Sequence, residues 1–188
     1  MPTLTRKTNE TDITATFDLY GKGQRDISTG IGFFDHMLGS FALHGGFDLT
    51  LKCDGDLGVD AHHTVEDVGI VLGKLFSSVD KAKITRFGEA FVPMDESLSF
   101  AAVDVSGRAF LVLDAAFTTE KCGEFDTCLT EEFFRAFAVN AGITLHLKNL
   151  YGANDHHKIE SLFKAAAHSL KRALVKTDGD VLSTKGVL

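Results

Sequence analysis

The sequence predicts an α+β fold made by tandem duplication of one half, a strand-strand-helix-strand-helix unit whose helices pack on one face of a mainly antiparallel or mixed sheet. Segment 36–52 aligns with segment 132–148, and the pattern His-His-x-x-Glu recurs at 62–66 and 156–160 after a loop shortened by two residues. Periodic apolar segments follow in the same order in both halves. The identities in the first alignment are Phe41 with Phe137, Ala42 with Ala138, Gly46 with Gly142, Leu49 with Leu145, Leu51 with Leu147 and Lys52 with Lys148.

In the first half, residues 11–20 (TDITATFDLY) alternate between apolar and polar side chains and predict a strand. Residues 33–45 are apolar at helical spacing and end in glycine, which is typical of a helix C-cap. Residues 47–53 alternate again and predict the next strand. Residues 61–79 place their apolar side chains along one stripe, as an amphipathic helix does.

The second half repeats this order, with strands expected at 98–106 and 109–117, a helix at 129–142, a strand at 143–149 and a helix at 156–176. The break between the halves falls near residues 82–90, and neither half contains a low-complexity segment. We therefore expect a single catalytic unit over residues 1–188, built from repeats at approximately 1–84 and 85–188.

Composition limits the partners of the chain. Its content of 44% hydrophobic and 24% charged residues is ordinary for a folded soluble protein. No apolar run approaches the roughly 20 residues of a membrane span, and the start MPTLTRKTNETDIT lacks the apolar region of a signal peptide. A net charge of −7 argues against a nucleic-acid or membrane partner, although a local basic pocket could still hold a small anion. The odd cysteines Cys53, Cys122 and Cys128 lack C-x-x-C spacing and are interpreted as reduced thiols, so we expect a cytoplasmic protein.

Each His-His pair is expected to open a helix, because Asp60 precedes the first pair and Asn154 and Asp155 precede the second as candidate N-caps. Successive helical residues are rotated by about 100°, so the two imidazoles of a pair diverge while the glutamate lies between them one turn away. One ion cannot easily bind both histidines of a pair. The spacing therefore predicts that each pair serves two different ions.

Imidazole and carboxylate ligands without a thiolate suit Zn, Mn, Fe or Co. Two pseudo-equivalent sites with several nitrogen and oxygen ligands suit six-coordinate Mn²⁺ at least as well as tetrahedral Zn²⁺. His36 and its repeat counterpart Glu132 are further candidates. A single His-His pair at a helix start is typical of an exposed surface, but two pairs in matching places of a repeat favour metal binding. The candidate ligands from the residues alone are His36, His62, His63, Glu66, Glu132, His156, His157 and Glu160.

Across the whole chain the sequence resembles the imidazoleglycerol-phosphate dehydratases of histidine biosynthesis. The resemblance rests on TGIGFFDHML (29–38), DAHHTVEDVGIVLG (60–73), HHKIESLFKA (156–165) and the tail STKGVL (183–188). It implies a duplicated α+β fold of the ribosomal-protein-S5-domain-2-like type. It also implies a homo-oligomer of 24 subunits whose active sites are shared between adjacent chains.

The resemblance implies that His36, His62, His63, Glu66, His156, His157 and Glu160 are ligands of two Mn²⁺ ions per active site. One position departs from the family pattern, since many relatives have EHFF where this chain has EEFF, so that Glu132 stands in place of histidine. A carboxylate can replace imidazole at Mn²⁺, and Glu132 is therefore kept as a ligand. The alternative is an exposed helix residue, and Glu131 is its immediate neighbour.

The implied reaction removes water from D-erythro-imidazoleglycerol phosphate and gives imidazole-acetol phosphate. The resemblance implies that the substrate imidazole bridges the two Mn²⁺ ions as an anion and that a diazafulvene-like intermediate forms. It assigns the general base to Glu10, which the residues alone would suggest is solvated. The residues implied in binding the phosphate are Arg86, Arg108, Lys164, Ser183 and Lys185. Helix geometry separately turns Lys164 toward the metal side, and its repeat counterpart is Ile70.

Two other classes of protein remain open on the residues alone. A dinuclear phosphoester hydrolase would use a metal-bound hydroxide, but the duplicated ligand set and the missing Asp-rich pattern argue against it. A metal-storage or assembly protein without catalytic activity would also account for two His-His pairs.

Overall fold

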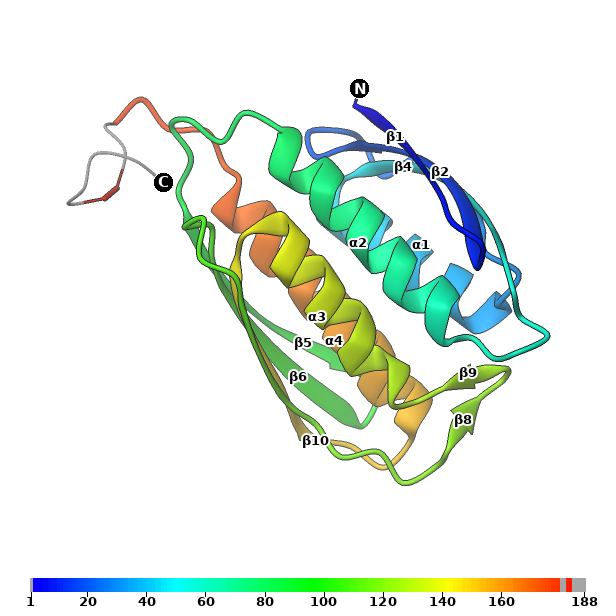
Figure 1. The fold of residues 1–188 in the computed structure, drawn as a ribbon. Coiled ribbons are helices and arrows are strands. Elements are labelled where there is room, and N and C mark those ends of the chain that lie inside the picture. The colour runs from blue at the N-terminus through cyan, green and yellow to red at the C-terminus, as the bar shows by residue number, and fades with distance from the viewer. Residues whose placement is uncertain (1, 180–181, 184–188) are drawn as a thin grey trace.

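The computed structural model describes residues 2–179 and 182–183, and it has two four-stranded sheets with four helices between them (Figure 1). The first half contains β1 (Thr3–Lys7), β2 (Thr11–Asp18), β3 (Arg25–Ser28), α1 (Gly32–Gly45), β4 (Asp48–Gly55) and α2 (His62–Ser78). The second contains β5 (Phe87–Met94), β6 (Ser97–Asp104), β7 (Phe110–Asp114), β8 (Lys121–Cys122), β9 (Phe125–Asp126), α3 (Leu129–Ala141), β10 (Thr144–Tyr151) and α4 (Asp155–Ala173).

The two sheets have the same topology, which confirms the predicted duplicated α+β class. Their strand orders are β1-β2-β4-β3 and β5-β6-β10-β7. In each sheet the third strand pairs in parallel with the strand that follows the first helix, and the other pairings are antiparallel. Each four-stranded sheet thus has three strands before the first helix of its half, where the sequence predicted two at most. The strands that were missed are β1, β3 and β5, all edge strands, together with the β8–β9 hairpin.

Apolar residues at alternate positions of the central strands face the helices and form the core. Ile13 and Phe17 of β2 and Leu145 and Leu147 of β10 are at most 1% exposed. Phenylalanine side chains from α1, α3 and α4 fill the space between the helices; Phe133 stacks on Phe163 with ring centroids 5.1 Å apart. Among the described residues, no helix is long and apolar enough to cross a membrane.

Helices of opposite halves pack as pairs, α1 against α4 and α2 against α3. The α2–α3 pair is close because Gly69 and Gly73 of α2 lie on the backbone of α3. A Cβ atom added at Gly73 would lie 2.6 Å from the carbonyl oxygen of Phe137 and 2.7 Å from Cβ of Asn140. These two glycines therefore set the distance between the halves along this pair.

The start of α4 is fixed by two neighbouring side chains, the amide of Asn154 and the carboxylate of Asp155. The Asn154 side chain caps the helix and accepts from the backbone N–H groups of His156 and His157. Asp155 is buried; it accepts hydrogen bonds from the backbone and hydroxyl groups of Thr118 and Thr119 and pairs with Lys158 at 2.7 Å. Burial alone would raise the pKa of Asp155, but Lys158 and these donors hold that pKa well below its usual range.

At the start of α2 the cap differs from the expectation. The N-cap residue is Ala61, and Asp60 lies one position earlier. The Asp60 carboxylate still accepts from the His62 backbone N–H at 2.8 Å, so it satisfies one free donor of the first turn.

Replacing Gly73 with alanine should lower the free energy of unfolding by about 1–3 kcal/mol, because the methyl group would overlap the α3 backbone. Gly58→Ala is the control, since nothing lies within 4 Å of a Cβ at that position. Urea unfolding followed by circular dichroism measures both variants. Equal stabilities for the two variants would contradict the close α2–α3 packing.

Replacing Asp155 with asparagine should cost about 3 kcal/mol at pH 7, because the buried Lys158 ammonium loses its counter-ion. Since the pKa of Asp155 is lowered by folding, its contribution is complete above the ordinary pKa and disappears as the pH falls through the folded value. The difference between wild type and variant should therefore narrow in strong acid. Urea unfolding at pH 7 and at acidic pH tests this, with the exposed Asp114→Asn as the control; a pH-independent difference would contradict the assignment.

Candidate metal centre

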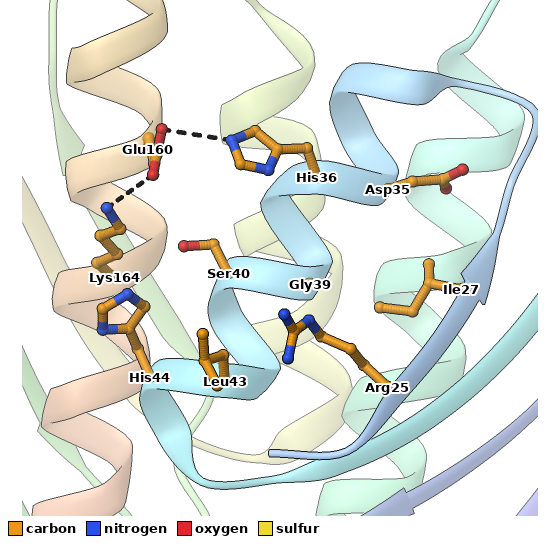
Figure 2. A pocket seen from close by; sticks show the side chains of 10 residues that line it. All are labelled: Arg25, Ile27, Asp35, His36, Gly39, Ser40, Leu43, His44, Glu160 and Lys164. Carbon is orange, nitrogen blue, oxygen red and sulfur yellow. Dashed lines mark ion pairs between the residues drawn. The ribbon is translucent and has the colours of Figure 1, made fainter.

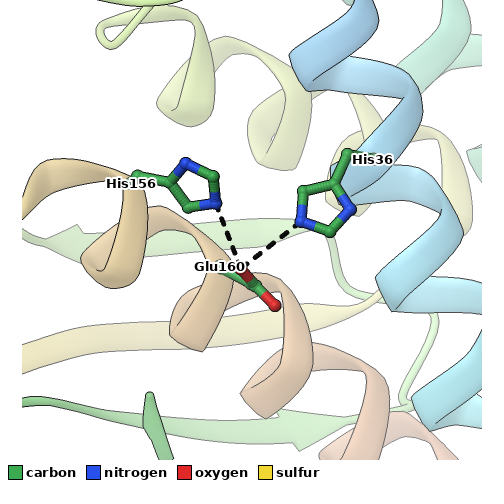
Figure 3. Close-up of side chains that lie close together, drawn as sticks. All are labelled: His36, His156 and Glu160. Atoms are coloured by element: carbon green, nitrogen blue, oxygen red, sulfur yellow. Dashed lines mark hydrogen bonds and ion pairs between the residues drawn. The ribbon is translucent and has the colours of Figure 1, made fainter. Parts of the chain in front are cut away.

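The α1–α4 helix pair brings together a first group of possible ligands, His36, His156 and Glu160, named cluster I here. The Nε2 atoms of His36 and His156 lie 3.4 and 3.2 Å from the same Glu160 oxygen, Oε2 (Figure 3). Phe33 packs edge-on against the His156 ring, with centroids 5.0 Å apart. His36 comes from the first half of the chain and the other two residues from the second, so the site forms only where the halves pack.

The α2–α3 pair brings together a second group, His62, Glu66 and Glu132, named cluster II. One possible ligand atom from each residue lies within 4.8 Å of the others. The Nε2 atom of His62 lies 3.8 Å from Oε2 of Glu66, and the Glu132 carboxylate is bound by Arg135. Each member of cluster II is the repeat counterpart of a member of cluster I, and again the halves exchange one residue.

The other two histidines, His63 and His157, belong to neither cluster. Their rings are nearly perpendicular to those of His62 and His156, at 89° and 74°, with centroids 6.2 and 6.0 Å apart. The imidazoles of each pair therefore diverge as helix geometry predicts. Each pair gives one histidine to a cluster of its own chain, and the other histidine lies outside both clusters.

Carboxylates orient the rings of the two remaining histidines, His63 and His157, through Nδ1. Asp56 lies 3.0 Å from Nδ1 of His63, and Glu96 lies 2.7 Å from Nδ1 of His157. The Asp56 hydrogen bond raises the pKa of His63, and the Asn154 backbone N–H together with His157 lowers the pKa of Glu96 to about 2. With Nδ1 held in this way, Nε2 is the ring nitrogen that is left as a possible metal ligand.

Glu10 lies at the β1–β2 turn, with its Oε1 atom 3.7 Å from Nε2 of His63. Asp95, at the β5–β6 turn, lies at the same distance from Nε2 of His157. Both side chains are more than half exposed, at 52% and 71%. An acidic side chain therefore lies beside the imidazole of His63 and another beside that of His157.

Beside cluster I a cavity of about 360 Å³ opens along α1 (Figure 2). Lys164 extends into this region from α4 and pairs with Oε1 of Glu160 at 2.7 Å. Burial alone would raise the pKa of Glu160, but the Lys164 ammonium holds it below its usual value. At the far end His44 contacts His168, with Nδ1 and Nε2 3.1 Å apart, a contact that the sequence did not predict.

The predicted phosphate-binding residues fall into two places. Arg86 and Arg108 meet at Asp104 of β6, at 2.7 and 3.2 Å, and Arg86 also donates to the Leu182 carbonyl beside Ser183. Lys164 is separate from these two arginines. The Arg86 backbone N–H donates to the carbonyl of Ala173, near the end of α4. Lys164 lies nine residues before Ala173, which is about 14 Å along the helix axis. Lys185 lies outside the described residues.

Three residues around the clusters were not predicted from the sequence: Arg135, Asp56 and Glu96. Arg135 follows Glu132 by three positions on a helix, a spacing that signals contact. Asp56 and Glu96 gave no such signal. Glu96 reaches His157 from a hairpin turn 61 residues earlier in the chain, and only the folded sheet brings it there.

The donor sets fit a divalent metal ion. Each cluster offers imidazole nitrogen and carboxylate oxygen from three side chains, which leaves positions open for further ligands and suits Mn²⁺, Fe²⁺, Co²⁺ or Zn²⁺. Among the described residues, neither cluster contains a thiolate. Three ligands with open positions are typical of a catalytic rather than a closed structural site.

Known proteins share this sequence and fold. The sequence model of imidazoleglycerol-phosphate dehydratase matches residues 29–170. The imidazoleglycerol-phosphate dehydratase of Acetivibrio thermocellus is 57% identical over 98% of this chain and 97% of its own, and that of Methylorubrum extorquens is 53% identical over the same shares.

Two solved structures are also similar. The crystal structure of imidazoleglycerol-phosphate dehydratase from Staphylococcus aureus matches with a TM-score of 0.83 and 40% identity, over 94% of this chain and all of that one. That of the Pyrococcus furiosus enzyme matches with a TM-score of 0.87 and 36% identity, over 98% of this chain and all of that one. Sequence and structure agree over almost the whole length, and the chain belongs to the imidazoleglycerol-phosphate dehydratase family.

Proposed function

We propose that this hydro-lyase dehydrates D-erythro-imidazoleglycerol phosphate to imidazole-acetol phosphate in cytoplasmic histidine biosynthesis, with one Mn²⁺ ion at each kind of cluster. The observation that carries the proposal is the pair of clusters itself. Two sites of matching geometry suit a substrate group that presents two similar donor atoms, and the two nitrogens of an imidazole ring are such a group. The residues of clusters I and II would hold the two ions, which would supply Lewis-acid and template chemistry to a substrate imidazole bound as an anion.

Side chains of the protein itself orient the histidines and accept the proton. Asp56 and Glu96 fix the tautomer and orientation of His63 and His157, so that each presents Nε2. Glu10 is positioned as the general base, because its carboxylate is accessible and lies beside an imidazole that this proposal makes a metal ligand. A carbon-bound proton removed at this position would pass to Oε1 or Oε2 of Glu10.

Lys164 is suited to bind the phosphate at cluster I. Its ammonium group stands at the edge of the cavity and is already oriented by Glu160. Arg108 supplies a more exposed guanidinium, at 62%, while Arg86 is held by Asp104 on one side and by the Leu182 carbonyl on the other. We assign Ser183 and Lys185 to the same phosphate, as the resemblance implies.

Assembly into a homo-oligomer, the 24-mer that the resemblance implies, accounts for how these groups meet. In one chain His63 lies beside Glu10 and outside cluster II, and Arg86 is distant from Lys164. A single substrate can contact all of them if neighbouring copies supply them, so we propose that His63 and His157 complete the metal sites of adjacent subunits. This supports active sites shared between subunits.

The proposed reaction is tested with the full chain. After removal of metal and addition of Mn²⁺, imidazoleglycerol phosphate should give a ketone that is measured by its enol absorbance. Metal-free protein should be inactive and recover on addition of Mn²⁺. Absence of turnover with any divalent metal would refute the dehydratase, and release of inorganic phosphate instead would favour a dinuclear hydrolase.

Glu10→Gln should lower kcat by a factor of about 10²–10⁴ with little change in KM, because the amide cannot accept the proton. Metal content, measured by mass spectrometry, should stay at the wild-type value. Asp95→Asn is the matched control, because Asp95 lies beside His157 as Glu10 lies beside His63. A Glu10→Gln variant with the full kcat would remove Glu10 from the role of general base.

A further inference from the structure

The two clusters differ at one ligand. Cluster I has two imidazoles and one carboxylate, whereas cluster II has one imidazole and two carboxylates, because Glu132 stands where the repeat has His36. We propose that Glu132 makes the two sites unequal: cluster II is a tight, oxygen-rich site for a hard divalent cation, and cluster I is a weaker, exchangeable site. This inference rests on the metal-binding role assigned to both clusters above.

Glu132, and not its neighbour Glu131, is the residue of cluster II. The side chain of Glu132 is only 16% exposed and shares the cluster with His62 and Glu66. Glu131 is exposed and belongs to neither cluster of the described chain. The two glutamates therefore have the same charge and adjacent positions but different surroundings, which makes Glu131 a built-in control.

The charges of the two clusters differ by one unit. In cluster I the single carboxylate, Glu160, is neutralised by Lys164 at 2.7 Å. In cluster II the carboxylates of Glu66 and Glu132 carry two negative charges, and Arg135 supplies one positive charge. Cluster II therefore retains one net negative charge, which attracts a divalent cation more strongly.

The cations also come from different helices. Lys164 is on α4, and its repeat counterpart on α2 is the apolar Ile70; Arg135 is on α3, and its counterpart on α1 is Gly39. At cluster I this glycine lines the 360 Å³ cavity, so the approach along α1 is open (Figure 2). At cluster II the Arg135 side chain occupies the corresponding helix position and binds Glu132.

The two arrangements favour different behaviour. Carboxylate oxygens suit hard ions such as Mn²⁺ and Mg²⁺, and imidazoles suit borderline ions such as Zn²⁺ and Co²⁺. Cluster I carries no net negative charge once Lys164 pairs with Glu160, so an ion there is held more weakly and exchanges more readily. Arg135 pairs with Glu132 and lowers the negative charge that an incoming ion meets.

The test is a titration of the metal-free full chain with Mn²⁺, in which free Mn²⁺ is measured by its electron paramagnetic resonance signal. Wild type should show two classes of site, with dissociation constants at least about tenfold apart. Glu132→Gln should weaken the tight class by at least about tenfold, and Glu131→Gln should change neither class. Arg135→Gln should tighten the tight class, because it removes the opposing charge.

A second variant changes the ligand without removing it. Glu132→His gives cluster II the same donors as cluster I, so the two Mn²⁺ classes should converge, and Zn²⁺ should displace Mn²⁺ from both with similar ease. In wild type, Zn²⁺ should displace the weakly bound Mn²⁺ first. Circular dichroism and thermal unfolding verify that each variant is folded.

The inequality would be overturned if wild type showed one class of equivalent Mn²⁺ sites. It would also be overturned if Glu132→Gln left the tight class unchanged, or if Glu131→Gln weakened that class as much as Glu132→Gln did. These results would leave the proposed dehydratase intact. Failure of the wild-type chain to bind Mn²⁺ at all would instead overturn the proposed metal function, and this inference with it. The two failures are therefore distinguishable in one set of measurements.

Discussion

The packing of each helix against a helix of the other half is the constraint on which the rest of the structure depends. Neither cluster can form within a single half, because His36 needs α4 and Glu132 needs α2. The close approach at Gly69 and Gly73 holds α2 to α3, and phenylalanine packing fills the space around α1, α3 and α4. Folding of the core therefore brings together the three candidate ligands of each cluster.

The local electrostatics around the clusters follow from that packing. A buried carboxylate such as Glu160 is costly unless a cation is close, and Lys164 on the next turn of the same helix provides one. Asp155, at the start of α4, is also buried and is compensated by Lys158 and the two threonines. These fixed charges hold the first turns of α4 in place, and the direction of both His156 and His157 depends on them.

Much of the fold could be predicted from the sequence because the decisive patterns are local. The periodicity of 61–79 and 129–142 and the repeated His-His-x-x-Glu follow from helix geometry and are found in α2, α3 and α4. The edge strands β1 and β5 were missed because each has a solvent-facing side and weak apolar alternation. The carboxylate partners of His63 and His157 lie at very different distances along the chain. Asp56 precedes His63 by seven residues, whereas Glu96, at the β5–β6 turn, precedes His157 by 61 residues. Long-range contacts of this second kind have no local signature.

Duplication explains both the likeness and the difference of the two halves. In the proposed function, an imidazole ring presents two similar nitrogens, and the repeated sets of candidate ligands offer it two similar sites. The rest of the proposed substrate has no such symmetry, because it has one phosphate and one carbon-bound proton to lose. The halves can therefore keep the two His-His pairs and the glutamates Glu66 and Glu160, but they must diverge around them. The differences lie at His36 against Glu132, Lys164 against Ile70 and Arg135 against Gly39.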